Sequence, residues 1–244
     1  MISGDAQRTR LRPDSIVSWA PDILTLSTGP LAVIALIFAM EGKTELACRL
    51  VMVCLSVDAL DGYLARRLGT TSERGELLDR VFDRLHQIVT PSVIYYTFLH
   101  DALATMYAAS IITISYWRLV RRVPSREYFA GLPLNVHTIL MIASIYSGCP
   151  MDPAILLLLA LLSASPLKYY RRRRTSRMRD GGSLWFARFA VPLAIASFPR
   201  PLETLGPLFL LLEFAALAYA ALGWLPFAME GRGSLIARVL HRGS

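Results

Sequence analysis

Long apolar stretches, separated by short polar segments, constrain the fold of this chain more than any other feature of its sequence. Residues 21–40 and 102–120 are mostly apolar over about twenty residues, the length that a helix needs to cross a hydrocarbon core of about 30 Å. A mean hydropathy of +0.44 and 54% hydrophobic residues exceed what a water-soluble domain of this size requires. The sequence therefore predicts an all-α integral membrane protein.

The apolar stretches divide the chain into about eight transmembrane helices, a core of six followed by two C-terminal ones. The expected spans are 21–40, 46–68, 75–99, 102–120, 134–147, 153–165, 184–198 and 205–227. Residues 13–20, which begin with Pro13 and include Trp19, are expected to form a short amphipathic helix on the membrane surface. The predicted units are a tail with this helix (1–20), a transmembrane core (21–166), a basic loop (167–183), two C-terminal helices (184–228) and a polar tail (229–244).

Basic residues gather in alternate loops, which predicts the orientation of the chain. The net charge of +8 could indicate nucleic-acid binding, but the charges form short clusters between apolar runs, as expected of loops that face an anionic leaflet. With a cytoplasmic N-terminus, the outer turns hold only Lys43, Arg49 and Arg200, whereas the run 171–174 and most other arginines face inward. We therefore expect a cell-membrane protein with both termini in the cytoplasm and no nucleic-acid partner.

Four aspartates at fixed spacing form the main candidate site. Asp58 and Asp61 (i, i+3) share one face of the second predicted span, and Asp79 and Asp83 (i, i+4) share one face of the third. Four acids that converge in a membrane repel one another unless cations lie between them, and intramembrane acids are usually functional. Carboxylate oxygens suit Mg²⁺ or Mn²⁺, and two such ions about 4 Å apart can clamp a phosphoryl group during in-line displacement. The orientation places this metal site near the cytoplasmic face.

Small and basic residues beside the acids are suited to a phosphate-bearing ligand. Gly62 and Gly75 lack side chains where phosphates would have to approach the helix backbone. Arg66, one turn after Gly62, can offer a bidentate fork to a phosphate. The alternatives are that the glycines permit close helix packing and that single acids are paired structurally. A cation transporter that uses the four acids as its ion site is the hypothesis from another functional class.

Residues 58–83 read D-x-x-D-G-x-x-A-R, eight residues, then G-x-x-x-D-x-x-x-D, which resembles the signature of the CDP-alcohol phosphotransferase family at all its defining positions. Members transfer a phosphatidyl-type group from a CDP-linked donor to an alcohol and release CMP. The resemblance implies that the four aspartates hold two divalent cations over the CDP pyrophosphate and that Asp83 is the general base. It also implies a homodimer and a nucleotide pocket lined by Gly62, Ala65, Arg66 and Gly75. The stretch 21–25 is similar to the family's P-N-x-x-T, with Asp22 in place of Asn, and Thr25 is an expected contact of the CDP-lipid.

The acceptor alcohol is predicted from a second motif. Residues 118–121 (RLVR) and 128–133 (YFAGLP) resemble the phosphatidylserine synthase branch of the family, which includes archaetidylserine synthases. Arg118 and Arg121 (i, i+3) could bind a carboxylate or phosphate of the acceptor or the lipid, although they could equally be loop charges that contact lipid heads. The leading hypothesis is therefore that L-serine accepts the lipid from CDP-diacylglycerol or CDP-archaeol. Inositol phosphate or glycerol phosphate is the alternative, because the arginine cluster is generous for one carboxylate. The segment 131–133 could also be a simple turn into the next helix.

Two polar residues of the apolar segments have structural as well as functional interpretations. His86 lies three residues after Asp83 and could orient it, or it could be an interior hydrogen-bonded histidine. For Glu213 in the last span, we expect a structural hydrogen bond rather than a catalytic role.

Overall fold

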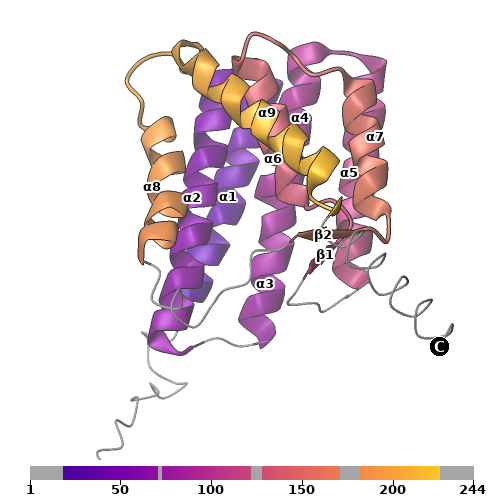
Figure 1. Cartoon of the computed structure of the whole chain (residues 1–244). Coiled ribbons are helices and arrows are strands. Elements are labelled where there is room, and N and C mark those ends of the chain that lie inside the picture. The colour runs from indigo at the N-terminus through magenta and orange to yellow at the C-terminus, as the bar shows by residue number, and fades with distance from the viewer. Residues whose placement is uncertain (1–18, 71–72, 122–127, 171–181, 226–244) are drawn as a thin grey trace, which may run out of the picture.

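The computed structural model describes residues 19–70, 73–121, 128–170 and 182–225, and these form a bundle of roughly parallel helices that α9 crosses obliquely (Figure 1). The helices are α1 (Ala20–Met40), α2 (Thr44–Leu68), α3 (Glu73–Arg84), α4 (Thr90–Leu99), α5 (Ala102–Val120), α6 (Leu134–Tyr146), α7 (Pro153–Ala164), α8 (Gly182–Ala196) and α9 (Gly206–Leu222). A π-helix, η2 (Leu85–Val89), joins α3 to α4, and a 3₁₀ turn, η4 (Leu202–Leu205), precedes α9. Two short strands, β1 (Tyr128–Ala130) and β2 (Lys168–Tyr170), complete the described elements.

The prediction of an all-α membrane protein is confirmed, and each predicted span coincides with a helical segment. Within the described ranges, three stretches are long and apolar enough to cross a membrane by themselves: Ala20–Met40, Ala102–Val120 and Leu202–Leu222. The α6 and α7 helices are shorter, about 20 Å at 1.5 Å per residue. The predicted surface helix at 13–20 lies outside the described residues apart from its last two positions, as do the arginine run and the C-terminal tail.

The third predicted span contains an irregularity at the level of the candidate site. Pro91 has no N–H and leaves the carbonyl of Gln87 without its i+4 donor, and the backbone widens into the π-helix η2 just before it. The hydroxyl of Thr138 on α6 donates to the Gln87 carbonyl in place of that donor. This contact fixes the segment that directly follows Asp83.

Small buried side chains allow α1 and α2 to pack closely. The α1 face consists of residues at helical spacing, Thr25, Thr28, Ala32, Ala35 and Ala39, and it meets Ala47, Cys48, Val51 and Cys54 of α2. In a bilayer, helix association depends on this kind of close van der Waals packing because lipid is as apolar as the side chains. The α1–α2 pair therefore provides a rigid base for the first two aspartates.

A two-stranded antiparallel ribbon is the exception to the all-α prediction. It pairs Tyr128 with Tyr170, Phe129 with Tyr169 and Ala130 with Lys168, and so joins the segment between the fourth and fifth predicted spans to the start of the predicted basic loop 167–183. Beyond the ribbon, the N–H groups of Gly131 and Leu132 donate to the carbonyls of Leu167 (2.7 Å) and Leu162 (3.2 Å). These bonds join the residues that precede α6 to the end of α7 and to the segment that follows it.

Candidate active site

The four predicted aspartates come together between α2 and α3. Side-chain oxygens of Asp58, Asp61 and Asp79 lie within 4.8 Å of one another, and the same limit holds for ligand atoms of Asp58, Asp83 and His86. Asp58 belongs to both groups, so the site is a pair of three-residue clusters with one shared carboxylate. This arrangement could hold two cations side by side.

The cluster contains buried oxygen and nitrogen atoms that have no hydrogen-bond partner in the described part of the chain and could bind a metal ion. Asp61 is only 3% exposed, and its buried Oδ1 has no hydrogen-bond partner among the described residues. Nε2 of His86 is likewise buried without a hydrogen bond, and it lies 3.7 Å from Oδ1 of Asp83. Because buried polar atoms are rarely left without partners, these atoms fit a site that is completed by a metal ion.

Neighbouring side chains orient two of the carboxylates. The hydroxyl of Thr25 on α1 donates to Oδ2 of Asp61 at 2.5 Å, and Nε2 of Gln87 donates to Oδ1 of Asp83 at 2.6 Å. Thr25 was expected to contact the CDP-lipid, and in the structure its hydroxyl is directed at a carboxylate. Gln87 was missed by the sequence analysis, although its position four residues after Asp83 on a helical segment was a usable signal.

The residues expected to line a nucleotide pocket lie beside the acids. Gly62 and Ala65 are half-buried on α2, Gly75 is half-buried on α3, and Arg66 is exposed. A Cβ atom on Gly62 would lie 3.1 Å from Nη1 of Arg66, so the guanidinium folds back across the glycine. Gly62 and Ala65 follow Asp61 by one and four residues on α2, and Gly75 precedes Asp79 by four residues on α3.

Gly29 is a second residue that the sequence analysis missed. A Cβ atom at this position of α1 would lie 2.3 Å from Cε1 of Phe82, which lies between Asp79 and Asp83 on α3. The glycine thus lets α3 approach α1 closely enough to present both carboxylates. The run of small residues at 27–29 (Ser-Thr-Gly) was the available signal.

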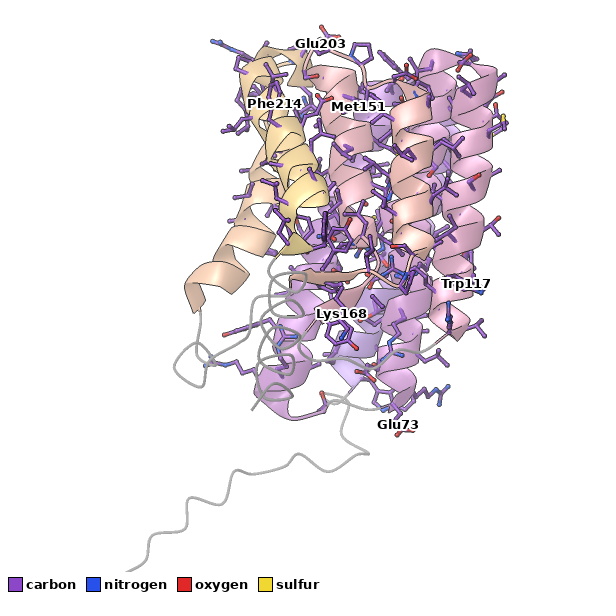
Figure 2. The ribbon with its side chains drawn as sticks, turned by 45° about the vertical axis from the view of Figure 1, so that its right-hand side comes forward. Glu73, Trp117, Met151, Lys168, Glu203 and Phe214 are labelled. Carbon is purple, nitrogen blue, oxygen red and sulfur yellow. The ribbon has the colours of Figure 1, made fainter. Side chains whose placement is uncertain are left out.

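A pocket of about 290 Å³ opens at the end of the bundle where Trp117, Lys168 and Glu73 are labelled in Figure 2. Three cationic residues, Arg118, Arg121 and Lys168, line it, and none of the described lining residues is acidic. Arg121 lies over the ring of Trp117 at 4.9 Å and Lys168 over the ring of Tyr128 at 4.8 Å. This positive lining suits an anionic group.

Arg118 has a more structural role than the sequence suggested. Its Nη1 donates to the carbonyl of Leu132 at 2.6 Å and its Nη2 donates to that of Ala130 at 2.7 Å. The arginine therefore holds the 130–132 segment in place, and that segment does form the turn into α6. Arg121 is exposed and more open to a ligand.

A buried chain of hydrogen bonds supports the wall of the pocket. The Tyr107 hydroxyl lies 3.0 Å from Nδ1 of His137, and Nε2 of His137 lies 2.9 Å from Oγ of Ser163, which lines the pocket. Ser163 donates to the Leu159 carbonyl, so we assign the proton of the neutral imidazole to Nε2 and the donor role toward Nδ1 to Tyr107. The chain links α5, α6 and α7.

The model of the CDP-alcohol phosphatidyltransferase family matches residues 18–165, more than half of the chain. The chain belongs to this family. As a CDP-alcohol phosphotransferase it is a membrane transferase of phospholipid biosynthesis, and the family implies a CDP-lipid donor and an alcohol acceptor. This membership replaces the cation-transporter hypothesis.

Curated relatives of the CDP-alcohol phosphotransferase fall into two groups. It is 27% identical over 150 residues to the CDP-diacylglycerol–serine O-phosphatidyltransferase of Methanocaldococcus jannaschii, covering 60% of this chain and 70% of that one. It is 22% identical to the archaetidylserine synthase of Methanothermobacter thermautotrophicus over 62% of this chain and 69% of that one. It is also 26% identical to the phosphatidylcholine synthase of Mesorhizobium japonicum, over 81% of each chain.

Proposed function

We propose that this phosphotransferase moves a phosphatidyl-type group, diacyl or archaetidyl, from a CDP-lipid to the hydroxyl of L-serine and releases CMP. The single observation that carries the metal-dependent chemistry is the pair of carboxylate clusters that share Asp58. The observation that favours serine is the cationic pocket at the same end of the bundle, because serine carries a carboxylate.

In this proposal Asp83 acts as the general base. Gln87 donates to its Oδ1 and so orients the carboxylate that takes the proton of the acceptor hydroxyl. The serine oxygen forms a bond to the lipid-linked phosphorus as the bond from that phosphorus to the bridging oxygen breaks, and CMP leaves with that oxygen. Two bound Mg²⁺ or Mn²⁺ ions would neutralise charge on the pyrophosphate. Asp58, Asp61, Asp79 and Asp83 would hold them, while Arg66 reaches a phosphate across Gly62 and beside Ala65 and Gly75.

Orientation, organisation and assembly follow the same proposal. Residues 21–166 form the catalytic core, with the site facing the cytoplasm and a homodimer as the working form. In support, Lys168 and Trp117 lie at the end of the bundle that carries the site, whereas Met151 and Glu203 lie at the other (Figure 2). The opposite end, near Glu203, holds Arg49 and Arg200, which are two of the three basic residues that the positive-inside count assigns to the outer turns.

Choline is the second candidate acceptor, because the phosphatidylcholine synthase relative matches more of the chain than the serine-specific relatives do. Recognition of a quaternary ammonium generally uses open aromatic faces. In the pocket, the rings of Trp117 and Tyr128 already carry Arg121 and Lys168, and a third cation would be repelled. The pocket chemistry therefore favours serine over choline.

An acceptor screen tests this proposal. Purified enzyme with CDP-diacylglycerol or CDP-archaeol and Mg²⁺ or Mn²⁺ should release CMP at least about tenfold faster with serine than with choline, inositol phosphate or glycerol phosphate. The reason is that the cationic pocket suits the carboxylate of serine, which choline lacks, and that residues 118–133 resemble the serine-specific branch. CMP release is measured by chromatography, with an acceptor-free reaction as the control. Faster release with choline or with either phosphorylated polyol would overturn the serine assignment.

Replacing Thr25 with valine should weaken metal binding about tenfold, because Asp61 loses the hydroxyl that orients it. The measurement is the Mg²⁺ or Mn²⁺ concentration that gives half-maximal CMP release. Thr28→Val is the matched control, since the Thr28 hydroxyl is buried one turn further on and donates only to the backbone carbonyl of Thr25. Equal metal requirements in the two variants would contradict a supporting role for Thr25.

A further inference from the structure

The C-terminal helix α9 lies outside residues 18–165, yet it is packed firmly on the core. It crosses the front of α6 (Figure 1), and its buried residues, Phe209, Glu213, Ala216 and Ala220, follow helical spacing. The ring of Phe209 lies 5.3 Å from that of Tyr146, and the hydroxyl of Ser147 donates to Glu213 at 2.9 Å. Glu213 thus makes the structural hydrogen bond expected of it.

The connection between α8 and α9 is clamped at the far end of the bundle. The guanidinium of Arg49 on α2 donates to the carbonyls of Ala196 (2.8 Å), Phe198 (2.6 Å) and Arg200 (2.7 Å), and it pairs with Glu45 at 2.6 Å. Because an arginine can donate five hydrogen bonds in a fixed fork, one side chain holds three carbonyls of the connection. The start of α9 is therefore fixed to the core.

The other end of α9 is joined to the ribbon by Tyr169. This tyrosine of β2 is fully buried, and its hydroxyl donates to the carbonyl of Ala220 at 3.1 Å. That carbonyl belongs to the last turn of α9, where carbonyls lack helical donors. Burial raises the pKa of Tyr169, so its phenol remains a donor throughout the neutral range. The ring packs on α9 as well, because a Cβ atom on Gly223 would lie 3.2 Å from its Cδ1.

The same tyrosine is one residue away from the cationic pocket. Tyr169 pairs with Phe129 across the ribbon, and its neighbour Lys168 pairs with Ala130. Phe129, Ala130 and Lys168 all line the pocket. A shift of the end of α9 would therefore move Tyr169 and, through the ribbon hydrogen bonds, one wall of the pocket.

We propose that Tyr169 is a positioning residue through which α9 sets the shape of the cationic pocket, so that the C-terminal helices control how tightly the acceptor binds. The consequence for the acceptor rests on the proposed function, in which this pocket receives the anionic group of the acceptor. The coupling between α9 and the ribbon does not rest on it.

The test uses the full-length Tyr169→Phe variant, which removes one hydroxyl and keeps the ring. Amide hydrogen exchange should become at least about threefold faster at residues 128–130 as well as at 220–223. The acceptor KM should rise about three- to tenfold, while kcat and the KM for the CDP-lipid stay within about twofold of the wild type. The matched control is Trp224→Phe, which removes the hydrogen bond from Nε1 to the Ala221 carbonyl at the same helix end, a bond that does not involve β2.

The outcomes separate this inference from the proposed function. Faster exchange at 128–130 in Tyr169→Phe, but not in Trp224→Phe, supports the coupling whichever alcohol proves to be the acceptor. Unchanged exchange at 128–130, or an equal effect in both variants, overturns it even if serine is the substrate. Equal losses of kcat and kcat/KM would also overturn it, because they would indicate general destabilisation rather than a change in the pocket.

Discussion

Asp58→Asn should lower metal-dependent CMP release by about a thousandfold or more. Among the described residues, Asp58 is the aspartate that the two clusters share, so the substitution removes one anionic ligand from both candidate metal positions at once. Amide oxygens are weaker ligands than carboxylates for hard divalent cations, and without the metals the pyrophosphate charge is no longer neutralised. Removing the metals from the wild-type enzyme with a chelator should reduce CMP release to a similar level.

The measurement is the initial rate of CMP release at saturating CDP-lipid and acceptor over a range of Mg²⁺ and Mn²⁺ concentrations. Glu76→Gln is the matched control, because Glu76 is an acid of α3 that pairs with Arg80 and belongs to neither cluster. We expect Glu76→Gln to stay within about twofold of the wild type. If Asp58→Asn kept more than one tenth of the wild-type rate, a shared metal ligand at this position would be contradicted.

The convergence of the acids could be predicted because it depends only on helical periodicity and on the hydropathy of the flanks. An i, i+3 pair and an i, i+4 pair on two consecutive helices joined by a short connection can meet at one level, and they do. Some helix ends could also be predicted, because capping depends on residues that are close in sequence. Asp101, for example, follows the left-handed His100 and caps α5 by accepting from the N–H groups of Leu103 and Ala104.

The supporting contacts could not be predicted because they join residues that are distant in sequence or depend on irregular backbone. Thr25 and Asp61 come from different helices, and the position of Gln87 depends on a π-helix that Pro91 and Thr138 stabilise. The ribbon joins two three-residue strands that are forty positions apart, too short for an alternating pattern to be recognised. The donors of Arg118 could have served a ligand or the backbone, and only the three-dimensional structure distinguishes the two.

Gly131→Ala should destabilise the protein by about 2–4 kcal/mol and disrupt the cationic pocket. Gly131 has φ +75°, a conformation that costs an L-residue about 1 kcal/mol. In addition, a Cβ atom there would lie 2.3 Å from the Ser163 carbonyl oxygen, so the backbone of the 131 segment or of α7 must move. Because Ser163 lines the pocket and Gly131 follows β1 directly, that movement should also raise the acceptor KM several-fold in the protein that folds.

Gly148→Ala is the control that separates the two contributions to this loss. Gly148 has nearly the same φ, +76°, but a Cβ atom there would have no neighbour within 4 Å. It should therefore lose only the conformational contribution, about 1 kcal/mol, and keep the wild-type acceptor KM. The free energy of unfolding is measured by denaturant titration in detergent micelles, and KM from CMP release. If the two variants lost equal stability, backbone conformation alone would account for the stability lost in Gly131→Ala. If both also kept the wild-type acceptor KM, the close packing of Gly131 against α7 would not shape the pocket.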